Sequence, residues 1–290
     1  MVNSNGLQIK QFPRISAIYY GLFESGYNYF SIECSPEHIA SLYDLIGKSS
    51  SSAFFSEASQ NTCEVYSYWP RAFIMESASF YLDDNNTTFR DFGTFRRKIM
   101  CAGNISETER GDALWRWIAN FPRAISDILS NGAFSEYMEW EKKWIAEQNN
   151  AYKSELALIE RCLEYCVNQW HSPVQSIQIC INPIKCVYSS DYHLVDSSFI
   201  FSAGAFRTDS IVHEFLHHVV HPVVEQQKEA ILMRRPMNKQ LDVSYYLSGD
   251  DAGIINGFEE TVVRLLTEKV MNEEYPKGLL SYVNTVLEES

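Results

Sequence analysis

The sequence predicts a helix-rich α+β protein, and three features lead to this prediction. Helical periodicity dominates from about residue 106 onward. Two short runs, 176–181 and 197–206, have the character of strands instead. The chain has 290 residues, 46% of them hydrophobic, which is enough for one large domain or two ordinary ones. We expect an N-terminal α/β region of unknown role at 1–130 and a second domain at 131–290.

The other elements follow from local signals. Aromatic and β-branched residues on both sides of the turn signal Ser25-Gly26 predict a β-hairpin over residues 15–32. Ser35 and Pro36 predict the start of a helix, and a lysine followed by four serines at 48–52 predicts a flexible connection. The remaining expectations are a strand or helix at 73–82, a helix capped by Ser106 that ends near Pro122, a helix from Ala124, and a long helical stretch over 134–170.

Charge and cysteine content exclude several classes of protein. The chain has 24 basic and 37 acidic residues, a net charge of −13 spread along its length, which argues against nucleic acid or an anionic membrane as a partner. No apolar run reaches the roughly 18–20 residues of a membrane span, and no secretory signal is visible, so we expect a cytoplasmic protein. The seven cysteines should then be reduced, with Cys162 and Cys166 as buried structural thiols.

The most informative stretch is residues 209–222, which holds four of the seven histidines. His213, Glu214 and His217 form an H-E-x-x-H motif. On an α-helix, residues four apart lie on one face, with Cβ atoms about 6 Å apart. Thr208 or Asp209 should cap this helix, and Pro222 should end it at His221.

This spacing is typical of a metal site. Two imidazoles from one helical turn can reach one Zn²⁺, at about 2.0–2.1 Å each, and leave room for a third protein ligand and a water. The carboxylate of Glu214 can then take a proton from that water. We therefore predict Zn²⁺ bound by His213 and His217, with Glu214 as the catalytic base.

The third ligand must come from another element, because His221 is about 12 Å along the helix from His213. A helix over 251–272, with its cap region at 248–251, is the best source. Its acidic pair leaves two alternatives. Glu259 borders the apolar arc, which would favour it as the buried carboxylate, whereas Glu260 shares the polar face with Arg264. The next candidates are Asp242 and Asp250.

The H-E-x-x-H motif followed by a glutamate on a later helix resembles the gluzincin class of zinc metallopeptidases. In that class, apolar residues follow the ligand glutamate at fixed spacing, and Glu260 reproduces this spacing with Val262, Leu265, Leu266 and Val270. The resemblance therefore implies a zincin-like domain in the C-terminal half, with Glu260 as the third ligand and Glu259 as the alternative. This chain departs from the class in its longer gap between His217 and Glu260, and in having Arg264 where an aspartate is common.

The function that this resemblance implies is hydrolysis of a peptide or protein substrate, as a protease. Tyr245 or Tyr246 could stabilise the oxyanion. The alternative for each tyrosine is a place in the hydrophobic core. The strand at 197–206 could bind an extended peptide if it is an edge strand, or could be a core strand. The alternative function is a catalytically silent zincin-fold binding protein with a structural metal. The sequence predicts neither the specificity nor the oligomeric state.

Overall fold

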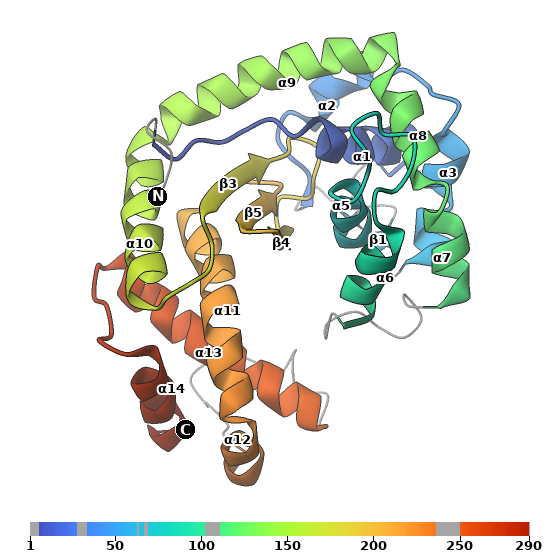
Figure 1. Ribbon diagram of the computed structural model, residues 1–290. Coiled ribbons are helices and arrows are strands. Elements are labelled where there is room, and N and C mark those ends of the chain that lie inside the picture. The colour runs from blue at the N-terminus through green and yellow to red at the C-terminus, as the bar shows by residue number, and fades with distance from the viewer. Residues whose placement is uncertain are drawn as a thin grey trace.

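The computed structural model describes residues 6–27, 34–62, 64–66, 69–101, 111–235 and 250–289. Helices surround one small three-stranded sheet, and a two-stranded ribbon lies in the N-terminal half (Figure 1). The prediction of a helix-rich α+β protein is confirmed.

The N-terminal half contains short helices and the ribbon. Its elements are α1 (Pro13–Glu24), α2 (Ile39–Leu42), η2 (Tyr43–Leu45), α3 (Ser52–Ser56), α4 (Ala58–Asn61), β1 (Val65–Tyr66), β2 (Trp69–Pro70), α5 (Phe73–Ser79), α6 (Phe92–Cys101), α7 (Asp112–Ile118) and α8 (Phe121–Leu129). The C-terminal half contains the sheet and the long helices. Its elements are α9 (Gly132–Ala151), α10 (Lys153–Gln169), β3 (Ser176–Ile181), β4 (Ser190–Val195), β5 (Ser198–Ala203), α11 (Thr208–Gln226), α12 (Lys228–Arg234), α13 (Asp251–Met271) and α14 (Leu279–Glu289).

The predicted β-hairpin over 15–32 is wrong for its first half, which forms helix α1. Every residue from Ile15 to Phe23 is buried, so the segment is covered on all sides and shows neither strand nor helix periodicity in its sequence. Pro13 occupies the first turn, where its missing N–H costs nothing. Tertiary burial therefore decides the helical conformation. Residues 28–32 of the expected hairpin lie outside the described residues.

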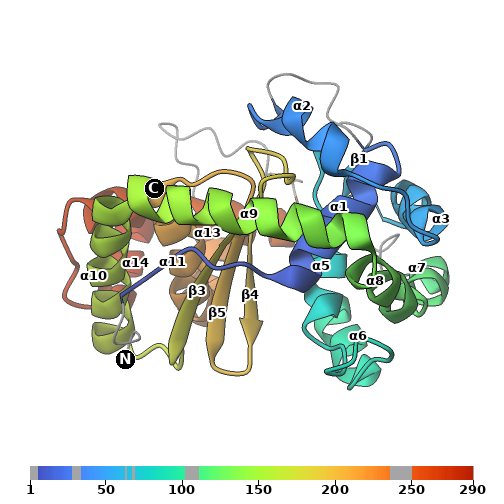
Figure 2. The ribbon, with the colours of Figure 1, turned by 90° about the horizontal axis from the view of Figure 1, so that it is seen from above.

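Two hydrophobic clusters make up the core. The first gathers around α1 and the short helices of the N-terminal half. The second lies between the sheet and helices α10, α11, α13 and α14. Helix α9 runs along both clusters (Figure 2), with Phe134 and Tyr137 in the first and Ile145 in the second. The stretch expected to be helical over 134–170 is thus two helices, which meet at Tyr152.

The sheet has the strand order β3-β5-β4, with β5 parallel to β3 and antiparallel to β4. Strand β5, the predicted strand over 197–206, is therefore central, which agrees with the alternative of a core strand and not with that of an edge strand. Strand β4 forms an edge instead. Sequence patterns did not indicate β4, because Asp191 and His193 are polar at buried positions and so hide the hydrophobic pattern of a strand.

Gly204 follows β5 directly and allows a close approach to the loop between β3 and β4. A Cβ atom at this position would lie 2.0 Å from the carbonyl oxygen of Cys186 and 2.3 Å from that of Lys185. Only glycine leaves room for this backbone contact. Lys185, in the loop that Gly204 approaches, has a fully buried side chain that reaches Asp191 on β4 and Ser202 on β5.

Helices α11 and α13 pack against each other below the sheet (Figure 1). Helix α11 continues through Pro222 to Gln226, so its predicted end at His221 is wrong. A proline inside a helix costs about 3 kcal/mol. Buried Val219, Val220 and Val224 offset this cost through their contacts in the second cluster.

The N-termini of helices α11 and α13 differ in their capping. The N-cap of α11 is Arg207, which makes no side-chain cap bond, rather than the expected Thr208 or Asp209. Helix α13 begins within the predicted cap region, where Asp250 Oδ1 accepts a hydrogen bond of 2.8 Å from the backbone N–H of Gly253. Among the described residues, no helix has both the length and the apolar character that a membrane span requires.

Candidate metal centre

Helices α11 and α13 bring together His213, His217 and Glu260. The two Nε2 atoms are 3.2 Å apart. Glu260 Oε2 lies 3.6 Å from Nε2 of His213 and 3.3 Å from Nε2 of His217. In the part of the chain that the structure describes, this is the group of three histidine, cysteine or acidic side chains with the geometry to hold a metal ion.

The distances within this group fit the size of a zinc site. Ligands about 2.0–2.1 Å from a tetrahedral zinc are about 3.3–3.4 Å from one another. The three observed separations, 3.2, 3.3 and 3.6 Å, are close to this value. Two imidazole nitrogens and one carboxylate oxygen are also ligands that zinc prefers. The residues present therefore fit a zinc ion with three protein ligands and one open position.

Glu259 contacts His217 from the side opposite to the donor group, and it also contacts His221. Its Oε1 lies 2.9 Å from Nδ1 of His217, and its Oε2 lies 2.7 Å from Nδ1 of His221. Hydrogen bonds from both histidines keep the pKa of Glu259 below its usual range, although burial opposes this. An ionised carboxylate can only accept, so Nδ1 of His217 carries a proton, and Nε2 is the nitrogen that would coordinate a metal ion.

Of the two candidate glutamates, Glu260 lies in the donor group and Glu259 holds a histidine of that group. Arg264 donates from Nε to Oε1 of Glu260, which leaves Oε2 toward the histidines. The arginine that stands where the resembled class often has an aspartate therefore orients the carboxylate of Glu260. The carboxylate that contacts the imidazole of His217 from outside the donor group is that of Glu259.

The electrostatics of the group favour a bound cation. Burial by itself would lower the pKa of His217, but hydrogen bonds to Glu259 and Glu260 raise it to about 10. The pKa of Glu260 falls well below its usual range, because His213, His217 and Arg264 outweigh the effect of burial. Two ionised carboxylates thus surround the imidazoles, and a metal ion would supply the positive charge that they attract.

Glu214 stays outside this donor group, and strand β4 holds it in place. The hydroxyl of Ser190 donates to Oε1 of Glu214 over 3.0 Å. Burial raises the pKa of Glu214, while His217 and His213 counteract the rise. A carboxylate with a raised pKa beside a candidate metal site is suited to accept and return a proton. Sequence reasoning missed Ser190, since nothing local to it indicates a partner 24 residues away.

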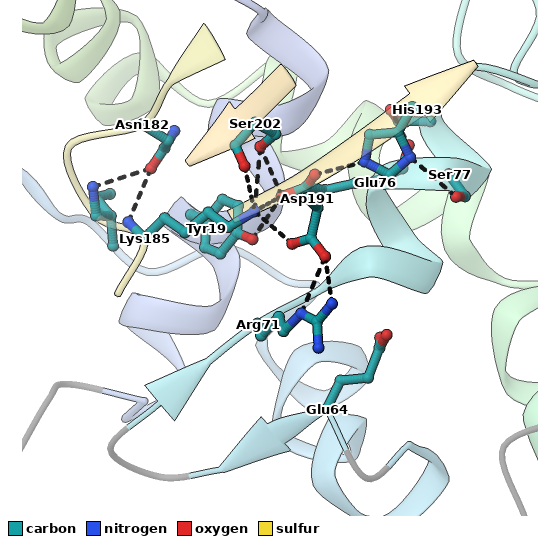
Figure 3. Close-up of polar contacts among 12 residues, drawn as sticks. Tyr19, Glu64, Arg71, Glu76, Ser77, Asn182, Lys185, Asp191, His193 and Ser202 are labelled. Atoms are coloured by element: carbon teal, nitrogen blue, oxygen red, sulfur yellow. Dashed lines mark hydrogen bonds and ion pairs between the residues drawn. The ribbon is translucent and has the colours of Figure 1, made fainter. Parts of the chain in front are cut away.

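An ion cluster that is buried except for Arg71 includes Asp191, the residue after Ser190; its members are Arg71, Glu76, Lys185, Asp191 and His193 (Figure 3). Lys185 Nζ donates to Glu76 over 2.9 Å and to Asp191 over 2.8 Å. The other oxygen of Asp191 accepts from Arg71, and the other oxygen of Glu76 lies 2.8 Å from Nε2 of His193. The cluster joins α5 of the N-terminal half to β4 and to the loop before it. It therefore fixes the strand that carries Ser190.

The remaining candidates from the sequence do not join the site. Asp250 caps α13. Tyr245, Tyr246 and Asp242 lie outside the described residues. Cys162 and Cys166 are buried free thiols in the second hydrophobic cluster, as expected.

Comparisons with protein-family models, with curated proteins and with solved structures return no match for this chain.

Proposed function

We propose that the protein is a zinc-dependent hydrolase of the metallopeptidase type, with a zincin-like domain in its C-terminal half. The observation that carries this proposal is the group of three donor atoms from His213, His217 and Glu260, which are 3.2–3.6 Å apart. Its separations match those of tetrahedral zinc ligands. Glu214, on the same helix as the histidines, is the base that such a site needs.

The chemistry follows from the positions of the side chains. A bound zinc ion polarises a carbonyl group and lowers the pKa of a water molecule toward about 7. Glu214 accepts the proton of the attacking water, whose oxygen forms the new bond to the carbonyl carbon. The C–N bond then breaks, and Glu214 passes the proton to the leaving amine. Ser190 donates to Oε1 of Glu214, so Oε2 is the oxygen left to accept and return the proton.

The outer edge of β4 suggests an extended peptide as substrate. The carbonyl of Ser189 accepts from Gly204 and so faces β5, whereas the carbonyl of Leu194 accepts from Lys98 on the other side. Because backbone directions alternate along a strand, Ser190 and Tyr192 present their N–H and C=O groups to the outer edge. In the described chain these groups have no hydrogen-bond partner, and a peptide strand could pair with them.

The decisive experiment combines a metal analysis with an assay. The purified protein should contain close to one zinc per chain and should cleave members of a randomised peptide library, followed by mass spectrometry. Glu214→Gln is the matched control: it should keep the zinc and the fold but lower the rate roughly 10²-fold or more.

Two results would contradict the proposal in different ways. Stoichiometric zinc in a His213→Ala, His217→Ala double variant would show that this group does not bind the metal. Zinc bound by the histidines, with no cleavage of the library by the wild-type protein, would favour a catalytically silent binding protein with a structural metal.

A further inference from the structure

Cys34 and Cys186 bring two thiols together from distant parts of the chain. Cys34 precedes α2, and Cys186 lies in the loop between β3 and β4. The backbone N–H of Val187 donates to the carbonyl oxygen of Cys34 over 3.2 Å. The thiol of Cys186 also hydrogen-bonds to that of Cys34. Both residues are free thiols in the first hydrophobic cluster, and both backbone and side-chain contacts hold them together.

The separation of the two residues suits a disulfide bond. Each Cα atom lies about 2.4 Å from the backbone atom of its peptide group that joins the hydrogen bond between Val187 and Cys34. The two Cα atoms are therefore at most about 8 Å apart, and this limit includes the roughly 4.4–6.8 Å that is usual for disulfides. The thiol contact shows that the two side chains point toward each other. A disulfide thus needs a closer approach of the two sulfur atoms but no change of fold.

The surroundings of Cys186 fix its position. A Cβ atom at Gly204 would lie 2.0 Å from the carbonyl oxygen of Cys186, so the loop packs directly on the end of β5. The same oxygen accepts a hydrogen bond from the N–H of Ser189 over 3.0 Å. The sulfur of Cys186 accepts from the N–H groups of Tyr188 and Ser189. A sulfur atom held in this way beside Cys34 favours a reaction within the chain.

Cys162 and Cys166 form a pair with the opposite property. They are four residues apart on α10 and as fully buried as Cys186. Residues four apart on a helix have Cβ atoms about 5–6 Å from each other. A disulfide requires about 3.5–4.5 Å between its Cβ atoms. The regular helix therefore keeps these two thiols from joining, and they serve as a matched control.

From this geometry we infer that Cys34 and Cys186 form a redox site, in which a low-molecular-weight disulfide oxidises the two thiols to a disulfide bond. The bond would join the segment before α2 to the loop that carries Lys185, the residue between Glu76 and Asp191 in the ion cluster. Oxidation would thereby fix this loop covalently to the N-terminal half. The inference is independent of the proposed hydrolase function.

The more accessible thiol, that of Cys34, starts the reaction. Cys34 is 9% exposed and Cys186 is fully buried, so a small disulfide R–S–S–R reaches Cys34 first. Burial raises the pKa of Cys186 to about 11, which keeps its thiol protonated at neutral pH and makes it the poorer first nucleophile.

Two exchange steps then complete the reaction. The sulfur of Cys34 attacks R–S–S–R, which gives a mixed disulfide and releases one R–SH that carries the proton of Cys34. The sulfur of Cys186 attacks Sγ of Cys34 and releases the second R–SH, which carries the proton of Cys186. Two electrons pass from the protein thiols to R–S–S–R, so one disulfide forms as another is reduced.

The experiment treats the folded, full-length protein with excess glutathione disulfide and then blocks the remaining thiols with iodoacetamide under denaturing conditions. Mass spectrometry of the intact protein and of its peptides identifies the product. We expect a peptide pair linked through Cys34 and Cys186, which dithiothreitol separates again. Its yield should exceed that of a link between Cys162 and Cys166 by about 10-fold or more.

Three variants test the roles of the individual thiols. Cys34→Ser should form no link to Cys186. Cys186→Ser should stop at the mixed disulfide of glutathione with Cys34, because the thiol of the second step is missing. Cys162→Ser is the control and should form the same link as the wild type.

The competing explanation is that Cys34 and Cys186 are only small apolar side chains of the core. It predicts that both are alkylated in the wild-type protein after treatment with glutathione disulfide, and this result would overturn the inference. Glutathione retained on Cys34 of the wild type, with Cys186 alkylated, would overturn it as well. Both results come from the wild-type protein and do not depend on the folding of any variant.

Discussion

Oε1 of Glu259 lies 2.9 Å from Nδ1 of His217, on the side of the imidazole opposite to the donor group. The adjacent residue, Glu260, contributes an oxygen to that group, 3.3 Å from Nε2 of the same histidine. Two consecutive glutamates therefore bind one imidazole from two sides. Under the proposed function, the two glutamates have different roles, with Glu260 as a metal ligand and Glu259 as the group that orients a ligand.

The first prediction separates these roles. Glu260→Ala should weaken zinc binding by more than about 100-fold, because a bond and a negative charge are both lost. Glu259→Ala should weaken it by about 10-fold, which is the lower end of the usual effect of removing a group that orients a metal ligand. Zinc affinity can be measured by competition with a chromogenic chelator. His221→Ala is the control, since His221 contacts Glu259 but not the donor group. A larger loss for Glu259→Ala than for Glu260→Ala would reverse the assignment.

The second prediction concerns Ser190, the residue of β4 that donates to Glu214. Ser190→Ala should leave zinc content unchanged and lower kcat by about 10-fold, because the base loses the hydrogen bond that fixes its orientation. KM should change little. Steady-state kinetics on a cleaved library peptide provide the measurement, and Ser210→Ala near the start of α11 is the control. If kcat stays at the wild-type value in Ser190→Ala, the hydroxyl does not position the base.

The third prediction concerns Glu141, a fully buried carboxyl in α9 whose donors are all uncharged. It accepts hydrogen bonds from Gln11, Ser16, Tyr137 and Asn182. Burial raises its pKa to about 7 from an ordinary value of 4.5. The folded state therefore holds this proton more tightly than the unfolded state does. The contribution to stability is complete below pH 4.5, falls as pH rises from 4.5 to about 7, and is constant above that.

Between pH 4.5 and about 7, the contribution of Glu141 to the free energy of unfolding should fall by about 3 kcal/mol. Urea unfolding of the wild type and of Glu141→Gln at pH 5, 6, 7 and 8 tests the prediction. Because the glutamine cannot ionise, the stability of the variant relative to the wild type should increase with pH. A difference between the two proteins that is independent of pH would show that Glu141 does not titrate in this range.

The fourth prediction concerns Lys185, which lies between the carboxylates of Glu76 and Asp191. Lys185→Met should lower the free energy of unfolding by about 3–5 kcal/mol, since it leaves two buried carboxylates with fewer cations. Chemical denaturation measures this loss. Adding Glu76→Gln and Asp191→Asn should recover part of it, because the unpaired charges are then removed. Arg161→Ala breaks an exposed pair and should cost less than about 1 kcal/mol.

The sequence by itself determined the elements whose pattern is local. The H-E-x-x-H spacing places His213 and His217 on one face of a helix wherever that helix lies, and α11 contains both. The cap residue Asp250 and the apolar arc after it similarly predicted α13. Strand β3 was predicted because its residues have strand character between clear turn signals.

Tertiary structure decided the features that depend on residues far apart in the chain. Segment 13–24 is a helix because the first hydrophobic cluster covers it on all sides, and α11 passes Pro222 because buried valines offset the cost. Burial by itself could not choose between Glu259 and Glu260, since both are buried. The orientation of α13 relative to α11 decides between the two glutamates. It directs Glu260 to the Nε2 atoms of His213 and His217, and it directs Glu259 to Nδ1 of His217. Ser190 and Glu214 are 24 residues apart in the chain, and Arg71 and Asp191 are 120 residues apart. Only the packing of β4 brings the members of each pair together.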